Sequence, residues 1–267
     1  MSKRKRILIW AAGLVLVLFA YGWLFGVASL IAVEARYIGW KVPVVRKTPV
    51  ELADTSISPQ PGFEHAFSGF AFELPWSDID ESRSKTVGKM QVVAFRSGNA
   101  ILLGAPGPRE FASAVLEHGW DRETFTELYG AEPLESDYKM YDLMLRTSPS
   151  SVSIFSGRKT AVANTMMLTI KAIAEPSGAA TGVFTIHTPH FKGFQYGDPS
   201  AGAKRITLDF LDDAGGLELS ISPKNNGPDA HISQPQINRI IQSVRRISSS
   251  DLTDLSQLGT SESVKCF

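Results

Sequence analysis

The longest apolar stretch of the chain lies close to its N-terminus. Residues 7–33 contain no charged side chain, and Lys3, Arg4, Lys5 and Arg6 directly precede them. A helix needs about 20 mostly apolar residues to cross the hydrocarbon core of a bilayer. The sequence therefore predicts a single transmembrane helix over residues 7–33, preceded by a short basic tail over residues 1–6.

Two alternatives to a retained anchor are a cleaved signal peptide, cut after Ala35, and a buried core helix. The apolar region of a signal peptide spans about 7–15 residues, which is much shorter than this run. Basic residues flank the run on both sides, but the leading cluster is tighter and has no acidic neighbour. The positive-inside rule then favours a cytoplasmic N-terminus and a following domain outside the cytoplasm.

Residues 34–62 are rich in proline and show no clean hydrophobic period, which predicts a linker or stalk. From residue 63 onward, alternating apolar positions predict short strands and amphipathic positions predict helices. The expected strands lie at 70–74, 90–95, 100–103 and 183–187, followed by a hairpin over 205–222. The expected helices lie at 108–118, 134–147, 158–174 and 234–247, with a further short helix between Asp121 and Gly130.

Two of these helices carry clear end signals. Asp121 can cap the helix that Gly130 closes, and Ser233 with Gln236 has the form of a capping box, with Pro235 in the first turn. The stripe of isoleucine and valine that follows in the last helix needs an apolar partner, and the 205–222 hairpin offers one.

The order of elements predicts an α+β fold, in which an antiparallel-sheet domain flanked by helices occupies residues 63–247. It also suggests two related β-β-β-α halves. In this hypothesis the strand at 70–74 corresponds to that at 183–187, and the helix at 108–118 to that at 234–247. The serine-rich residues 248–267 lack a sustained pattern, which predicts a flexible tail.

Charge and cysteine content exclude some classes of function. Acidic and basic residues number 27 each, but four of the basic residues precede the apolar run, so the rest of the chain is net acidic. Because phosphate binding requires a basic face, we expect no nucleic-acid partner. The single cysteine, Cys266, excludes an intramolecular disulfide and a clustered thiol metal site.

Neither of two metal-like segments is complete. His187 and His190 lack a zinc-motif spacing and a nearby cysteine or glutamate that would complete a ligand set. Residues 78–84 resemble the start of a calcium loop, but Arg83 stands where glycine is needed and Lys89 where glutamate is needed. We therefore predict no metal and no cofactor.

Catalytic motifs are equally weak. The G-x-S-x-G elbow of serine hydrolases is absent, and His65 beside Ser68 is a pairing that is common by chance. The glycines of residues 104–107 do not form a phosphate-binding loop. Trp76 and Trp120, each close to an acidic residue, are candidates for the rim of a binding cleft, although burial in the core is their more ordinary role.

The sequence thus predicts a single-pass protein of the cell membrane, with a non-catalytic domain outside the cytoplasm. Its expected partners are the lipid bilayer, through residues 7–33, and an envelope protein or a small ligand. The alternative is a membrane-anchored hydrolase whose site assembles only in three dimensions, and a third hypothesis is a scaffold subunit that acts through its anchor. No residue is assigned a catalytic, cofactor-binding or metal-binding role.

Overall fold

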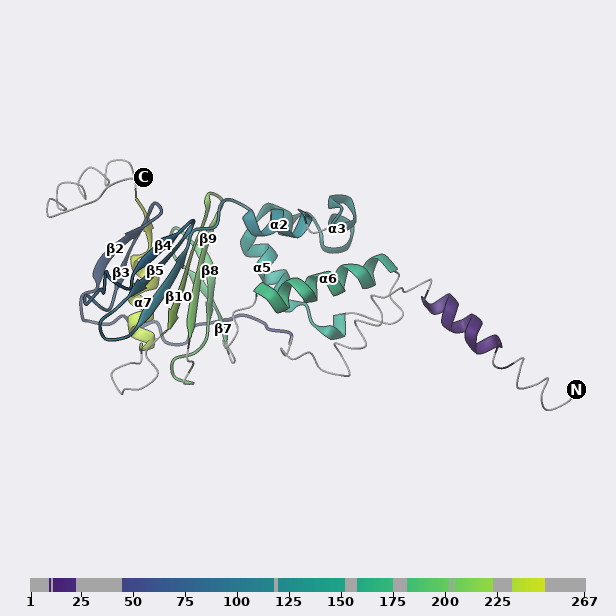
Figure 1. Ribbon diagram of the computed structural model, residues 1–267, viewed down its shortest axis with the longest axis horizontal. Coiled ribbons are helices and arrows are strands. Elements are labelled where there is room, and N and C mark those ends of the chain that lie inside the picture. Colours follow the sequence, from purple (N-terminus) through teal and green to yellow (C-terminus); the bar gives the residue numbers. More distant parts are fainter. Residues whose placement is uncertain are drawn as a thin grey trace, which may run out of the picture. The chain divides into compact units, whose positions relative to one another are not determined.

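The computed structural model describes residues 10, 12–22, 45–117, 120–151, 158–174, 182–201, 203, 205–222 and 232–247 (Figure 1). Contacts divide the chain into two compact units. One consists of Met1–Thr48 and Phe111–Glu175, and the other of Pro49–Glu110 and Pro176–Phe267. The predicted domain over 63–247 therefore contains a sheet unit and a helical unit.

The sheet unit contains an eight-stranded sheet in the order β1-β7-β8-β9-β10-β6-β5-β4. Every pairing in it is antiparallel except that of β1 with β7. In this order the strands are Val50–Glu51, Val183–His187, Lys192–Tyr196, Ile206–Asp212, Gly215–Ser222, Ala100–Gly104, Met90–Ala94 and Lys85–Val87. The predicted α+β class with a large antiparallel sheet and flanking helices is confirmed.

A second sheet of three strands has the order β11-β3-β2, with bounds Arg245–Arg246, Phe70–Leu74 and Phe63–Phe67. The proposed equivalence of the two halves is not matched by this topology. The strand at 70–74 lies in the small sheet, whereas the strand at 183–187 lies in the large one. The two segments therefore do not begin matching β-β-β-α units.

The core of the sheet unit is one apolar cluster to which β3, the β9–β10 hairpin and helix α7 (Gln234–Ser243) all contribute. Alternate residues of a strand face the same side, so Ile206, Leu208 and Phe210 of β9 share one face. Leu208 pairs with Leu219 of β10, and both are fully buried. Ile240 of α7 belongs to the same apolar cluster. The hairpin and the last helix thus contribute to one apolar cluster, as the predicted packing requires.

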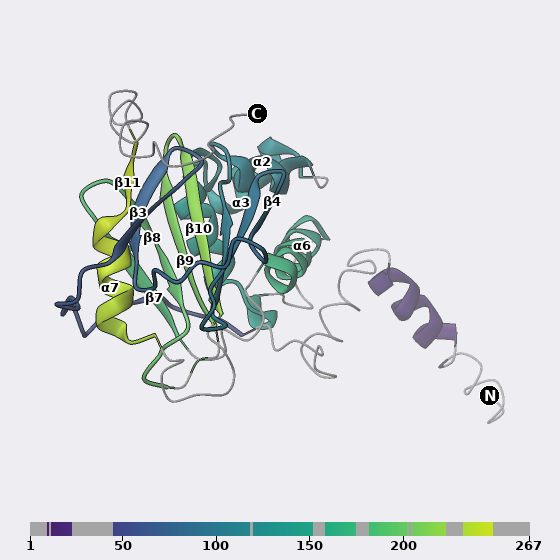
Figure 2. The same cartoon turned by 60° about the vertical axis from the view of Figure 1, so that its left-hand side comes forward.

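Helix α7 begins as predicted, with the capping box of Ser233 and Gln236. It ends at Ser243, however, and not at residue 247. Arg245 and Arg246 instead pair with β3, and the Ile247 amide donates to the Gly69 carbonyl at 2.8 Å. Pairing with β3 thus satisfies the backbone hydrogen-bonding groups of residues 245 and 246, which a longer helix would have paired internally. Helix α7 itself lies beside β3 (Figure 2).

The C-terminal part of the predicted linker is hydrogen-bonded along α7. The side-chain amide of Asn238 donates to the backbone carbonyls of Asp54 and Ser56, at 2.8 and 2.7 Å. The Ser58 amide donates to the Pro235 carbonyl at 3.0 Å. Residues 54–58 therefore belong to the sheet unit and do not behave as a free spacer.

The described part of the helical unit contains helices α2 to α6 and the 3-10 turn η2. In chain order the elements are Glu110–Glu117, Arg122–Tyr129, Glu132–Glu135, Asp137–Arg146, the turn Pro149–Ser151, and Arg158–Ala174. The helix predicted over 134–147 is interrupted, because Ser136 is extended with φ −146° and ψ 123°. The buried ammonium of Lys171 on α6 donates to the carbonyls of Val45, Leu145 and Thr147, which fixes residue 45 to this unit.

Residues 12–22, in the middle of the predicted span, form a helix whose large apolar side chains are exposed; Leu16 is 70% and Phe19 73% accessible. No helix among the residues described is both long and apolar enough to cross a membrane. Most of the remainder of 7–33, together with the predicted tails over 1–6 and 248–267, lies outside the described residues.

Candidate functional site

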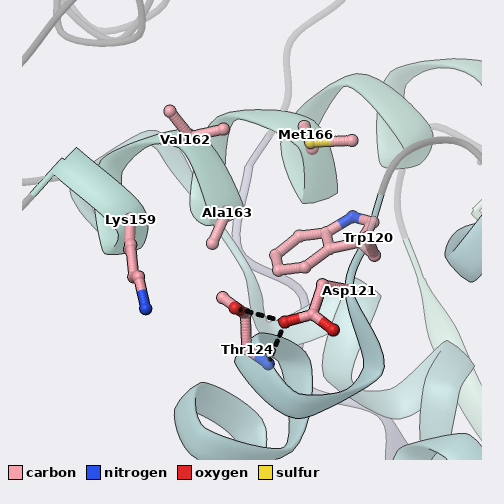
Figure 3. Close-up of a pocket in the computed structure, with 7 residues that line it drawn as sticks. All are labelled: Trp120, Asp121, Thr124, Lys159, Val162, Ala163 and Met166. Carbon is pink, nitrogen blue, oxygen red and sulfur yellow. Dashed lines mark hydrogen bonds between the residues drawn. The ribbon is translucent and has the colours of Figure 1, made fainter.

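The candidate site is a hollow of about 240 Å³ in the helical unit (Figure 3). It lies between the start of α3 and one face of α6. Its lining residues are Trp120, Asp121 and Thr124 on the α3 side, and Lys159, Val162, Ala163 and Met166 on the α6 side.

The α3 side is fixed by a helix cap. The carboxylate of Asp121 accepts hydrogen bonds from the Thr124 amide at 2.9 Å, the Thr124 hydroxyl at 2.7 Å and the Glu123 amide at 3.3 Å. The pKa of Asp121 is lowered, chiefly by the Thr124 hydroxyl and then by the two amides, with a small contribution from Lys159. This carboxylate is therefore charged and held in place at neutral pH.

Trp120 stands directly before this cap and forms a hydrophobic staple with Phe125, four residues into the helix. The two rings are 5.2 Å apart at an interplanar angle of 74°. Trp120 is 7% exposed, and its indole N–H has no hydrogen-bond partner among the described residues. The ring is thus a rigid, largely apolar wall with one unsatisfied donor.

A hydrogen bond ties the two sides together. The hydroxyl of Tyr129 on α3 donates to the side-chain oxygen of Asn164 on α6 at 2.8 Å. Burial raises the pKa of Tyr129 well above its ordinary value, so the phenol stays neutral and remains a donor. This hydrogen bond therefore links α3 to α6, the two helices whose residues line the hollow.

The α6 side follows from helical spacing. Positions 159, 162, 163 and 166 fall on one helix face, three or four residues apart. Ala163 is small, and the hollow opens in front of it, while Lys159 extends along the side opposite Trp120 (Figure 3). The Lys159 ammonium forms no ion pair within the part of the chain that the structure describes.

The arrangement of the described residues suits binding. Its walls are mainly apolar, with one ammonium on one side and one capped carboxylate on the other. Ligand pockets in proteins commonly measure about 300–1,000 Å³, so this hollow is sized for a single ring or a short chain. Among the seven lining residues described, the one hydroxyl, that of Thr124, is already engaged by Asp121.

Two acidic side chains with raised pKa values lie next to each other on the large sheet. Asp209 of β9 pairs across the ladder with Glu218 of β10. Burial, and then the charge of Glu218, raise the pKa of Asp209, whereas a hydrogen bond from Tyr196 acts in the opposite direction. Burial also raises the pKa of Glu218, and Arg205 opposes that shift. The pair therefore retains protons at pH values where isolated carboxyls have lost them.

We expect Asp209→Asn to flatten the pH dependence of stability. Because the folded-state pKa values of both carboxyls are raised, their stabilising contribution is complete below about pH 4, the ordinary carboxyl range. It is lost as the pH rises through the raised values. Urea unfolding midpoints between pH 4 and 8 should fall with pH for the parent and less steeply for Asp209→Asn. Equal slopes of midpoint against pH in the parent and in Asp209→Asn would contradict this expectation. The control is Asp213→Asn, on the exposed turn that joins β9 to β10.

The histidines considered in the sequence lie at separate places in the described structure. His187 and His190 are exposed around the β7–β8 turn, and no group of three metal-ligating side chains occurs within the described ranges. His65 hydrogen-bonds with Gln91 at 3.3 Å and packs on the Phe72 ring. Neither interaction involves Ser68, which occupies a turn with φ 49°.

The calcium-like segment is a hydrogen-bonded loop. Asp80 accepts from the amide and hydroxyl of Ser82, and Asp78 accepts from the amide of Ser97. Of the two tryptophans, Trp76 packs on Phe95 beside the core, whereas Trp120 lines the hollow. Sequence patterns indicated Asp121 only as a helix cap and gave Thr124, Lys159 and Ala163 no role, because only the packing of α3 on α6 brings them together.

Comparison with known proteins assigns the chain to no family. No protein-family model matches it, and no curated protein or solved structure is significantly similar to it. Its function is therefore argued from the chemistry of its own residues.

Proposed function

We propose that this protein is a single-pass membrane protein whose domain, held outside the cytoplasm, binds a partner without catalysing a reaction. The hollow beside Trp120 is its binding site. The observation that carries the binding function is this preformed hollow, which has apolar walls, a rigid aromatic wall and an ammonium without an ion pair among the described residues. Concave apolar sites with a few convergent polar groups are typical of ligand binding.

The membrane location is supported by the apolar run over 7–33. Its described part, residues 12–22, is a helix with large apolar side chains on its exposed surface. Exposing such side chains to water costs about 25 cal/mol for each Å² of apolar surface, whereas a lipid environment removes this cost. The basic residues 3–6 favour a cytoplasmic N-terminus, which leaves the domain on the other side.

A membrane-anchored hydrolase is the second candidate, and the Asp209–Glu218 pair is the observation that favours it. Carboxyl pairs with raised pKa values are common in general acid–base catalysis. Asp209, however, is only 7% exposed, which leaves little access for a substrate. The binding function therefore agrees better with the geometry.

Site-specific photo-crosslinking tests the binding function. The photoreactive residue p-benzoylphenylalanine would replace Val162, which is 39% exposed at the hollow, in the full chain in native membranes. We expect an adduct of defined mass that disappears when Ala163→Phe fills the hollow. The matched control carries the same residue at Val87, which is 67% exposed on β4. Identical adducts from both positions, or an adduct that persists in Ala163→Phe, would overturn the assignment of the site.

A further inference from the structure

We propose that the hollow selects a small free carboxylate with an apolar body, such as an aryl- or alkyl-substituted short-chain acid. This inference rests on the proposed binding function and specifies its ligand class. The carboxylate would lie at Lys159, and the apolar body would lie against Trp120 and Ala163.

The apolar end is defined by rigid walls. Trp120 is held by its contact with Phe125 and by the cap that follows it, so its ring does not have to be ordered when a ligand binds. Figure 3 shows Ala163 facing the space between Trp120 and Lys159. A preorganised wall of this kind favours affinity, because little conformational entropy is lost when the ligand binds.

The charge of the ligand follows from a comparison of the two charged side chains of the hollow, Asp121 and Lys159. The Asp121 carboxylate already accepts three hydrogen bonds at the N-terminus of α3, where the helix dipole also stabilises it. The Lys159 ammonium has three donors and no ion-pair partner within the described ranges. An anionic ligand therefore supplies a missing interaction, whereas a cationic ligand would compete with donors that Asp121 already has.

The volume of the hollow limits the size of the apolar part of the ligand. The hollow offers a volume of about 240 Å³. This volume suits one aromatic ring with a short side chain. It is too small for a complete lipid.

The test uses the full chain in nanodiscs, because detergents are themselves amphiphiles and would compete. The five tryptophans are replaced by 5-fluorotryptophan, and loss of one ¹⁹F resonance in Trp120→Phe assigns Trp120. Three probes share one body: 3-phenylpropionate, 3-phenylpropanamide and 3-phenylpropylamine. We expect the carboxylate to shift the Trp120 resonance in a saturable manner, and to bind at least about tenfold more tightly than the amide or the amine. A gain of this size is typical of one hydrogen bond to a charged group.

Two variants test whether the binding of 3-phenylpropionate depends on the charge of Lys159. Lys159→Gln should weaken 3-phenylpropionate about tenfold and leave the amide unchanged. The control, Lys85→Gln on exposed β4, should change neither. Equal binding of the three probes, preference for the amine, or no effect of Lys159→Gln would overturn the carboxylate assignment. Tighter binding of N-acetylphenylalanine than of 3-phenylpropionate would overturn the free-acid assignment in favour of a peptide C-terminus.

Failure of this inference is distinguishable from failure of the proposed function. Saturation by the amide or the amine, or adducts at position 162 without any response to these probes, would reject only the carboxylate. Loss of the position-specific adduct would reject the binding site itself.

Discussion

Gly193→Ala is expected to prevent stable formation of the large sheet. Gly193 lies in β8 and pairs with Phe210 of β9. A Cβ at this position would overlap the carbonyl oxygen of Asp209 and lie 2.8 Å from its carbonyl carbon. The obstacle is backbone in a central strand, so it cannot be relieved by a rotamer change. Overpacking of a core commonly costs about 1–3 kcal/mol, and we expect the loss here to be at or above the upper limit.

Gly104→Ala is the matched control in the same sheet. A Cβ on Gly104 would meet only the side chain of Glu218, at 3.8 Å, which is ordinary contact. Replacing a strand glycine where alanine fits typically stabilises by about 0.4–1 kcal/mol, because the unfolded chain loses conformational freedom. Hydrogen exchange of the β8 and β9 amides, together with urea unfolding midpoints, should separate the two variants. Equal protection in both would contradict the close approach of β8 and β9.

Leu219→Ala and Ile240→Ala are each expected to destabilise the sheet unit by about 2–5 kcal/mol. Leu219 is 0% exposed on β10 and Ile240 is 1% exposed on α7, within one apolar cluster. Removing either side chain loses apolar burial and leaves a cavity that the close-packed surroundings fill only in part. Chemical denaturation, with hydrogen exchange reporting on β10 and α7, would measure the loss.

The double variant tests whether the two elements depend on each other. Residues that share a packing cluster commonly show coupling energies of about 0.5–3 kcal/mol. We therefore expect the combined loss to differ from the sum of the single losses. Strict additivity, or single effects near zero, would count against the packing of α7 on the hairpin. Ser222→Ala, at the partly exposed end of β10, serves as the control.

Periodicity predicted the elements whose sequence carries a regular apolar stripe. The β9–β10 hairpin and α7 belong to this class, and the structure places their apolar stripes in one cluster. Strand β8 was missed because only Phe194 and Tyr196 alternate in it around a polar residue, which is too short a pattern to identify a strand. Its Gly193, which reads as a turn signal in the sequence, instead permits close approach to β9. The end of α7 was misplaced because β11 pairs with a strand that is distant in the sequence.

The candidate site was visible only in fragments. Asp121 was recognised as a cap, and Trp120 as a residue that could rim a cleft. Lys159 and Met166 share a face of a helix whose bounds were predicted correctly. What the sequence could not supply was the partner of that face, since spacing within a helix gives no information on which other helix packs against it.

Protease protection tests the central claim most directly, namely that a membrane helix over 7–33 holds the folded domain outside the cytoplasm. Proteinase K would be added to intact cells whose outer envelope has been permeabilised, with a cytoplasmic protein as the control for membrane integrity. The account predicts that the 63–247 domain is degraded while the cytoplasmic control survives. A domain that stays protected until the cell membrane is lysed, or a chain that alkaline carbonate releases from the membrane, would contradict it.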